Sequence, residues 1–257
     1  MSPAAAYYDG RRGTHSNGQN YENKMGALLY LRAVNLTQGQ VEAAAARAEA
    51  GAGPGAAGPA LRLGLNVAWA GKFDDVVLLL AGSSAPSGGG GEEDDEDDDV
   101  DDDVDDGSRQ LLMQLKHRER RPLTRALLAG NSTDFGLRKY FESYCKVASA
   151  PQVRARALRC VLYTNASVEV HGAPRDADFE RLFVQLLNTG GSAGRLAQLD
   201  PAKDAAVCAS FAGEARADDF RRQFFVCSQQ AREDELDELL QQFQKHTKKH
   251  HSKAPPW

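Results

Sequence analysis

The feature that most constrains this chain is a run of acidic residues in its first half. Residues 92–106 read EEDDEDDDVDDDVDD and hold 13 of the 36 acidic residues in the sequence. A segment of this kind cannot bury enough apolar surface to offset the entropy lost on ordering, so we expect it to be disordered. With its Gly- and Ser-rich flanks it forms a low-complexity insert over residues 81–109. A folded core must therefore be assembled from apolar segments on both sides of this insert.

Two apolar segments flank the insert directly, and both have the character of strands. FDDVVLLL at residues 73–80 is β-branched and apolar after two aspartates, and LLMQLK at residues 111–116 resumes the pattern. We expect them to form a hairpin whose loop has been lengthened, because loop-closure entropy grows only slowly with length. Further strands are predicted at residues 61–69 and 156–170.

Other segments favour helices. Tyr21, Met25, Leu28, Leu29 and Leu31 recur at helical spacing after Gly18, and residues 39–50 favour helix through their alanine content. Further helical patterns cover residues 133–148, 176–188 and 216–244, the last with a short extended FFVCS inside it. Strands that alternate with helices predict an α/β fold with a mixed central sheet flanked by helices.

These patterns divide the chain of 257 residues into four parts. We expect a disordered N-terminus over residues 1–17 and a main domain over residues 18–170 that contains the insert. A helical C-terminal extension over residues 171–244 and a basic tail over residues 245–257 are expected to follow.

The net charge of −5 hides a basic body. Without residues 92–106, 31 basic residues face the remaining 23 acidic ones, a balance of +8. A basic surface of this kind is compatible with a polyanionic partner.

The cysteines and the hydropathy pattern bear on the compartment. Four cysteines lie far apart with no CxxC pair, which favours reduced, partly buried thiols over a zinc site or a disulfide framework. No apolar stretch approaches the roughly 20 residues that a membrane span needs, and no signal peptide is evident. We therefore expect an intracellular protein of the cytoplasm or nucleus, with no membrane partner.

Polar residues in the predicted hairpin are arranged as a candidate site. Gln114 and Lys116 share one face of their strand because side chains alternate along it. If the two strands pair, Asp75 from the preceding strand lies close to both, and Glu22 on the first helix can join them. Carboxylate and amide oxygens suit Mg²⁺, and a lysine can position an attacking water and offset negative charge on a phosphorane. This combination points to metal-dependent phosphodiester hydrolysis.

The order GQNYENKMGALLYL, FDDVVLLL and LLMQLKHRER resembles the PD-(D/E)XK, restriction-endonuclease-like superfamily, in the variant with glutamine in place of the acidic residue. It is most similar to the double-stranded DNA endonuclease domain of bacterial anti-phage effectors. Similar domains precede NTPase and ankyrin-repeat regions in arthropod proteins. The resemblance covers residues 18–170 and extends more weakly to about residue 244.

The resemblance implies a restriction-endonuclease-like core and a Mg²⁺- or Mn²⁺-dependent endonuclease that acts on double-stranded DNA with little sequence preference. It implies Glu22 as the helix acid, Asp75 as the principal metal ligand, and Gln114 with Lys116 as the QxK pair. Gln114 would be the second metal ligand. Asp74 stays open as the alternative to Asp75.

A basic segment directly follows these residues. His117, Arg118, Arg120 and Arg121 are placed to contact phosphates without reading sequence. An ordinary solvated turn is an equally good interpretation.

Alternatives remain for the whole constellation. Gln114 and Lys116 also suit the polar face of an edge strand, and Glu22 suits a first-turn acid favoured by the helix dipole. The chain could be a catalytically inactive nuclease-like module that keeps the fold and DNA binding, or a scaffold. The acidic run could be a solubilising spacer or a tethered DNA mimic that inhibits the chain, and a homo-oligomer stays open.

Overall fold

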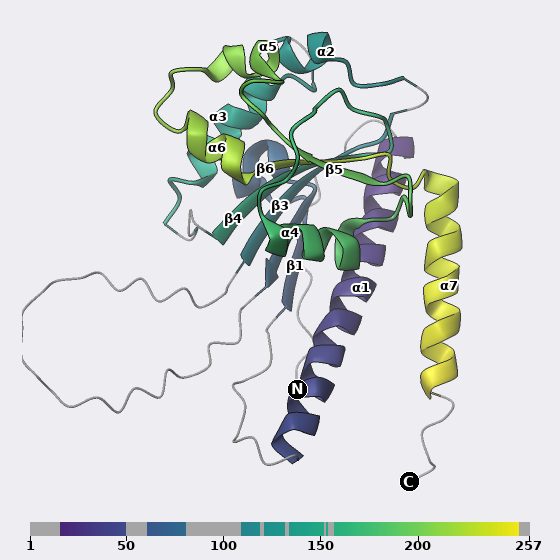
Figure 1. The fold of residues 1–257 in the computed structure, drawn as a ribbon. Coiled ribbons are helices and arrows are strands. Elements are labelled where there is room, and N and C mark those ends of the chain that lie inside the picture. The colour runs from purple at the N-terminus through teal and green to yellow at the C-terminus, as the bar shows by residue number, and fades with distance from the viewer. Residues whose placement is uncertain are drawn as a thin grey trace, which may run out of the picture.

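The computed structural model describes residues 16–49, 61–80, 109–118, 121–131, 134–151, 153 and 157–251. They form an α/β fold around a mixed six-stranded sheet with the strand order β1-β2-β3-β4-β6-β5 (Figure 1). The predicted α/β class, with a mixed sheet flanked by helices, is confirmed. The acidic run and the linker at residues 51–59 lie outside the described residues.

The strands pair in both directions. β1 (Leu61–Leu65), β2 (Val76–Leu80) and β3 (Arg109–Lys116) form an antiparallel meander, so the predicted hairpin across the insert is confirmed. β4 (Leu158–Thr164) runs parallel to β3, and β6 (Phe224–Ser228) runs parallel to β4. β5 (Arg195–Gln198) closes the far edge antiparallel to β6. The carboxyl ends of β3, β4 and β6 therefore meet at one rim of the sheet.

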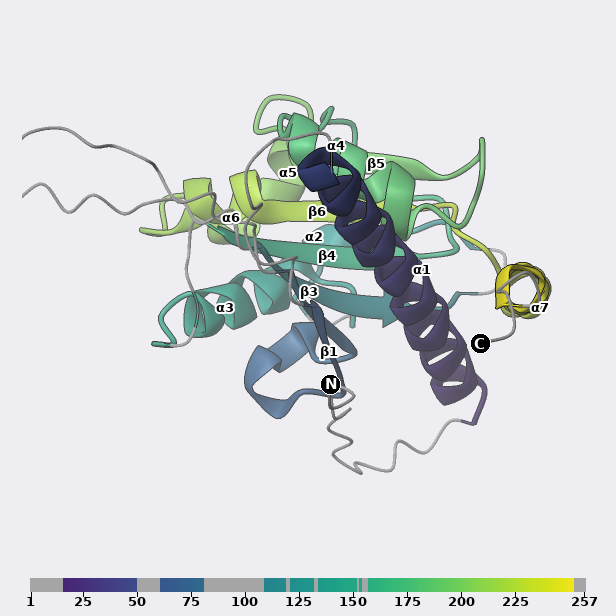
Figure 2. The ribbon, with the colours of Figure 1, turned by 90° about the horizontal axis from the view of Figure 1, so that it is seen from below.

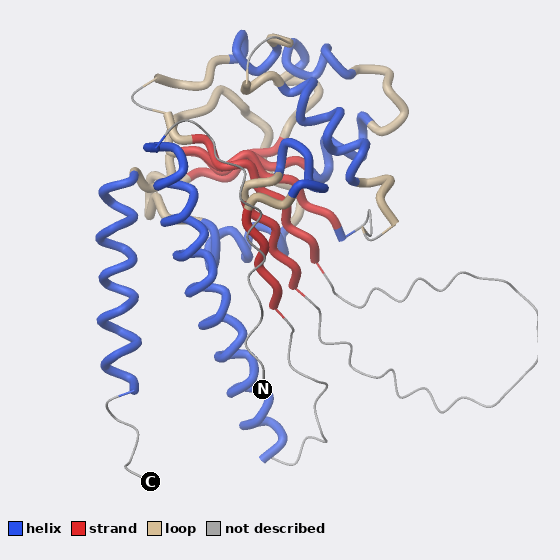
Figure 3. Tube along the Cα trace, turned by 180° about the vertical axis from the view of Figure 1, so that it is seen from behind, coloured by secondary structure: helices blue, strands red, loops and turns tan. Residues whose placement is uncertain are grey.

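Helices cover both faces of this sheet, as Figures 2 and 3 show. The longer ones are α1 (Ser16–Glu49), α3 (Leu137–Val147) and α7 (Glu233–His251). The shorter elements are η1 (Ala68–Phe73), α2 (Arg125–Ala129), α4 (Ala177–Leu182), η3 (Phe183–Leu187), α5 (Ala205–Cys208), η4 (Ala209–Phe211) and α6 (Ala217–Gln223).

Alternation along the strands produces two cores, one on each face. Leu112 of β3 faces a core shared with η1, α3 and α6, whereas Met113 faces a core shared with α1, α4 and η3. On the second face the helical stripe predicted for α1 is buried through Tyr21, Met25 and Leu28. Removal of such side chains from water is a main source of stability, at roughly 1.5–3 kcal/mol for a large apolar residue.

The C-terminal part differs from the expected helical extension. β5 and β6 belong to the same sheet as the strands of residues 18–170, so this expectation is corrected. FFVCS is β6, all five residues of which are buried. Such an apolar segment gives little periodic signal, and its place in the sheet depends on pairing with β4.

Some predicted boundaries also shift. α1 is continuous to Glu49, β1 ends at Leu65, and β4 spans only the centre of the predicted segment 156–170. α7 continues to His251, so part of the predicted basic tail is helical.

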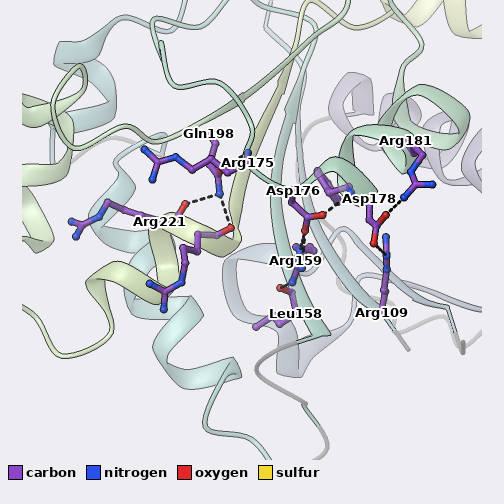
Figure 4. A network of polar contacts seen from close by, with 11 residues as sticks. Arg109, Leu158, Arg159, Arg175, Asp176, Asp178, Arg181, Gln198 and Arg221 are labelled. Atoms are coloured by element: carbon purple, nitrogen blue, oxygen red, sulfur yellow. Dashed lines mark hydrogen bonds and ion pairs between the residues drawn. The ribbon is translucent and has the colours of Figure 1, made fainter. Parts of the chain in front are cut away.

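A polar network fixes the end of the sheet opposite the rim where β3 ends (Figure 4). Arg109 at the start of β3 pairs with Asp178 of α4 at 2.8 Å, and Arg159 of β4 pairs with Asp176 at 2.7 Å. The Nε2 of Gln198 donates to the Arg222 carbonyl at 2.6 Å. These contacts hold α4 and β5 in place.

Two further findings concern the described helices and the cysteines. None of the described helices combines the length and apolar character that a bilayer-spanning segment requires. All four cysteines are free, and Cys160, Cys208 and Cys227 are buried while Cys145 is half-buried. The prediction of unpaired, partly buried thiols is confirmed.

Candidate functional site

Asp75 and Gln114 meet where β2 begins and β3 ends. Val76 pairs with Met113 in the antiparallel sheet, so Asp75, just before Val76, lies opposite Gln114, just after Met113. The Nε2 of Gln114 donates a hydrogen bond to Oδ2 of Asp75, and the Leu115 amide donates to the same oxygen at 2.6 Å. Because the Gln114 amide nitrogen faces Asp75, its carbonyl oxygen is free of this contact. The predicted convergence of a carboxylate and an amide is present.

The loop between β1 and β2 fixes the aspartate doublet. The Val67 amide donates to the Asp74 carbonyl at 2.7 Å, and the Asn66 amide donates to the Asp75 carbonyl at 3.2 Å. Gly71 in this loop has a φ of +63°, a conformation that favours glycine. The Asp75 side chain is 8% exposed and faces Gln114, whereas Asp74 is half-buried at the end of η1. This geometry favours Asp75 as the central acid of the pair.

The surroundings of Asp75 disfavour its charged form. Burial and, to a smaller extent, the neighbouring Glu22 charge raise the pKa of Asp75 to about 7. The hydrogen bond from Leu115 and the Lys116 charge act in the opposite direction but do not compensate. A carboxyl poised near neutral pH inside a charged cluster is typical of functional sites, although structural ion clusters produce the same effect.

Glu22 and Lys116 complete this cluster from two different elements. Burial raises the pKa of Glu22, the Lys116 ammonium lowers it and the Asp74 charge raises it. Lys116, the last residue of β3, is half-buried. The charges of Glu22, Asp74 and Lys116 thus act on this part of the rim, and a direct contact within the predicted set is the hydrogen bond between Gln114 and Asp75.

Glu22 reaches the rim because Tyr21 anchors the start of α1. The Tyr21 side chain is 1% exposed, and its hydroxyl donates to the Ala231 carbonyl at 3.2 Å. Its ring also lies 5.0 Å from the imidazole of His117, measured between centroids. The helix is therefore fixed against both the end of β3 and the segment that leads into α7.

The basic segment after β3 occupies the same rim. His117, Arg118 and Arg121 all line a pocket of about 930 Å³ beside the candidate site. The Arg118 amide donates to Oδ1 of Asn165 at 2.8 Å, and its guanidinium lies over the Phe135 ring at 5.3 Å. Arg120, the fourth predicted phosphate contact, lies outside the described residues.

Sequence reasoning overlooked Tyr140 of α3, which the pattern assigned only to an apolar helix face. Its side chain is fully buried; this burial raises the pKa of its hydroxyl, and the Asp75 charge adds a smaller increase. The hydroxyl donates to the Asp134 carbonyl at 3.4 Å. A tyrosine within an apolar stripe brings a polar group into the core, and this is the signal that could have identified it.

The number of side-chain oxygens at this rim limits how many protein ligands a metal ion could have. In the part of the chain that the structure describes, no group of three or more His, Cys, Asp or Glu side chains is arranged to hold a metal ion. The available donors are the Asp75 carboxylate and the Gln114 carbonyl oxygen, with Glu22 nearby. Mg²⁺ accepts such hard ligands and retains waters, so the donor set fits a weakly held Mg²⁺ with few protein ligands.

Comparison of the chain with protein-family models, with curated proteins and with solved structures gave no match. The resemblance to the restriction-endonuclease-like superfamily therefore stays a prediction that rests on the sequence motifs.

Proposed function

We propose that this chain is a metal-dependent endonuclease with a restriction-endonuclease-like core, and that it hydrolyses phosphodiesters of double-stranded DNA with little sequence preference. The observation that carries the proposal is the convergence of Asp75, Gln114, Lys116 and Glu22 at one rim. These residues come from three separate elements, and the motif order predicted them together.

Asp75 and the carbonyl oxygen of Gln114 would hold Mg²⁺ or Mn²⁺. When bound, the ion supplies Lewis-acid activation of the phosphoryl group and an acidified water. Its charge also favours the ionised form of Asp75, so the pKa of about 7 in its absence falls when the ion binds. Metal binding is therefore coupled to proton release near neutral pH.

Lys116 and Glu22 would act on the reacting groups. The Lys116 ammonium orients the attacking water and offsets negative charge that develops on the phosphate oxygens. Glu22, whose pKa is raised by burial, accepts a hydrogen bond from water on the helix side of the site. His117, Arg118 and Arg121 would contact flanking phosphates, and low sequence preference is expected because backbone contacts carry no base information.

A second candidate is a catalytically inactive module that keeps DNA binding. It is favoured by the neutral amide at Gln114 and by the lack, among the described residues, of a cluster with three acidic metal ligands. This module would bind DNA through the basic segment, and Asp75 would take no part in catalysis.

A plasmid assay separates the two candidates. Supercoiled DNA is incubated with the wild type, with Lys116→Ala, and with Lys203→Ala, which removes an exposed lysine far along the sequence. The endonuclease proposal predicts nicking with Mg²⁺ or Mn²⁺ by the wild type and Lys203→Ala but a loss of at least about a hundredfold in Lys116→Ala. Salt-dependent DNA binding without nicking in any metal would favour the inactive module, and equal nicking by all three proteins would contradict the assigned site.

A further inference from the structure

A pocket of about 930 Å³ is lined by Lys24 and by residues of the basic segment, which follows the candidate site in the chain. Its lining also includes Asn165, Ser167 and Gln230, together with the start of α7. Figures 1 and 2 show α7 beside α1 at the outside of the molecule.

The pocket is lined by side chains of both charges. Lys24 and the basic segment after β3 line it together with carboxylates from the first turns of α7. The Lys24 ammonium donates to Oδ2 of Asp237 at 2.7 Å and to Oε1 of Glu233 at 3.2 Å. A cation that lines the pocket is thus engaged by carboxylates that belong to α7.

These ion pairs are close to solvent. The exposed fraction of the side chain is 21% for Lys24, 27% for Glu233 and 49% for Asp237. Exposed pairs of this kind contribute little to stability and are weakened by salt. The contact can therefore be exchanged for another anion without unfolding α7, whose Leu236 is fully buried in the core.

Arg118 supplies an independent indication that an anion belongs here. Its Nη1 atom is buried and, within the described residues, has no hydrogen-bond partner. Its backbone and ring contacts with Asn165 and Phe135 hold the guanidinium at this rim. A buried donor without an acceptor is unfavourable, and a phosphate oxygen satisfies guanidinium donors well.

We propose that this pocket is a second contact surface for the nucleic-acid backbone, and that Glu233 and Asp237 occupy its cation Lys24 until phosphates replace them. This inference rests on the proposed function and extends it along the rim from Lys116 toward α7. The carboxylates of α7 act as an internal competitor that weakens non-productive binding, and a bound duplex gains Lys24 as a phosphate contact.

Duplex binding by the double variant Glu233→Gln/Asp237→Asn tests the competitor. Fluorescence anisotropy with a 20-base-pair duplex at several salt concentrations is expected to show affinity about 3- to 30-fold above the wild type. The slope of log affinity against log salt concentration should become steeper by about one, because Lys24 is then available to bind a phosphate and displace a counterion. Adding Lys24→Met to the double variant should remove this gain.

A matched control removes the same number of charges elsewhere. Glu180→Gln/Glu238→Gln changes two exposed carboxylates that do not line the pocket. Equal gains in both double variants would show that the effect comes from net charge alone and would overturn the proposal.

Arg232→Ala tests the surface even if the double variant misfolds, because it removes a lining cation and leaves the ion pairs of Lys24 intact. It should weaken duplex binding, whereas Arg62→Ala on β1 should not. Unchanged affinity in Arg232→Ala would overturn the surface.

The plasmid assay keeps this inference separate from the proposed function. Nicking that depends on Lys116, combined with equal duplex affinity in the wild type and the Glu233→Gln/Asp237→Asn variant, would refute the pocket while the endonuclease stands. Absence of nicking and of duplex binding in every protein would refute both.

Discussion

The raised pKa of Asp75 predicts that this residue destabilises the protein at neutral and alkaline pH. The substitution Asp75→Asn keeps the size of the side chain and an oxygen that can accept from the Leu115 amide, but it removes the charge. A carboxyl that is 8% exposed has exchanged most of its hydration for two hydrogen bonds to one oxygen. We expect the variant to be more stable than the wild type above pH 7.

The magnitude follows from the change in pKa. A rise from 3.8 to about 7 corresponds to about 4 kcal/mol, since each tenfold change in the proton equilibrium is worth about 1.4 kcal/mol. Because the folded-state pKa lies above the unfolded value, the folded state binds the proton more tightly between these two values. The contribution of Asp75 is therefore most favourable below about pH 4 and is lost as pH rises to about 7. At pH 8 we expect Asp75→Asn to gain roughly 2–4 kcal/mol, because side-chain relaxation reduces the full value.

Urea denaturation of both proteins from pH 4.5 to pH 8, with EDTA present, measures this difference. The gain of Asp75→Asn should be small at pH 4.5 and largest at pH 8, where the melting temperature rises by roughly 5–15 °C. Asp178→Asn is the control, because the pKa of Asp178 is shifted in the opposite direction: the ion pairs with Arg181 and Arg109 lower it. It should show no gain at pH 8. A gain that is independent of pH, or a loss of stability at pH 8 in Asp75→Asn, would refute the reasoning.

Three further predictions address the site, the backbone and the thiols. Gln114→Glu should lower the melting temperature by several degrees at pH 8 in EDTA, because it adds a carboxylate to a cluster of acids. Mn²⁺ should restore the melting temperature, and differential scanning fluorimetry measures both changes. A drop that Mn²⁺ leaves unchanged would argue against a metal site. Gly190→Ala should cost about 2–3 kcal/mol in urea denaturation, because the added carbon would lie 2.0 Å from the Gln229 carbonyl oxygen. Gly191→Ala has open space but a φ of +56° and should cost about 1 kcal/mol, so equal costs would contradict the packing argument. In the native protein a thiol reagent such as DTNB should modify Cys145 first, because the other three cysteines are buried, and simultaneous modification of all four would contradict this order.

The candidate site was predicted only in part. The apolar strand patterns predicted the hairpin, alternation predicted the shared face of Gln114 and Lys116, and pairing of the two strands was expected to bring an aspartate close to them. It left the doublet Asp74 and Asp75 unresolved. The pairing of Val76 with Met113 places Asp75 against Gln114, and this is a property of register that no local pattern specifies.

What the sequence determined by itself was mainly local. The alternation in LLMQLK defined which residues share a face, and the stripe through Tyr21, Met25 and Leu28 defined α1, because periods of two and 3.6 residues follow from the backbone alone. The acidic run lies outside the described residues, so its expected disorder stays a prediction.

The tertiary structure decided which distant segments come together. Pairing with β4 made FFVCS a central strand and brought the chain after residue 170 into the sheet. Packing against α1 set Lys24 against Asp237, a contact between residues 213 positions apart. Burial, with a smaller contribution from the Glu22 charge, moved the pKa of Asp75 to about 7. Desolvation and long-range pairing depend on the whole assembled fold. The sequence could therefore predict which residues belong to this candidate site, but not how their pKa values are shifted.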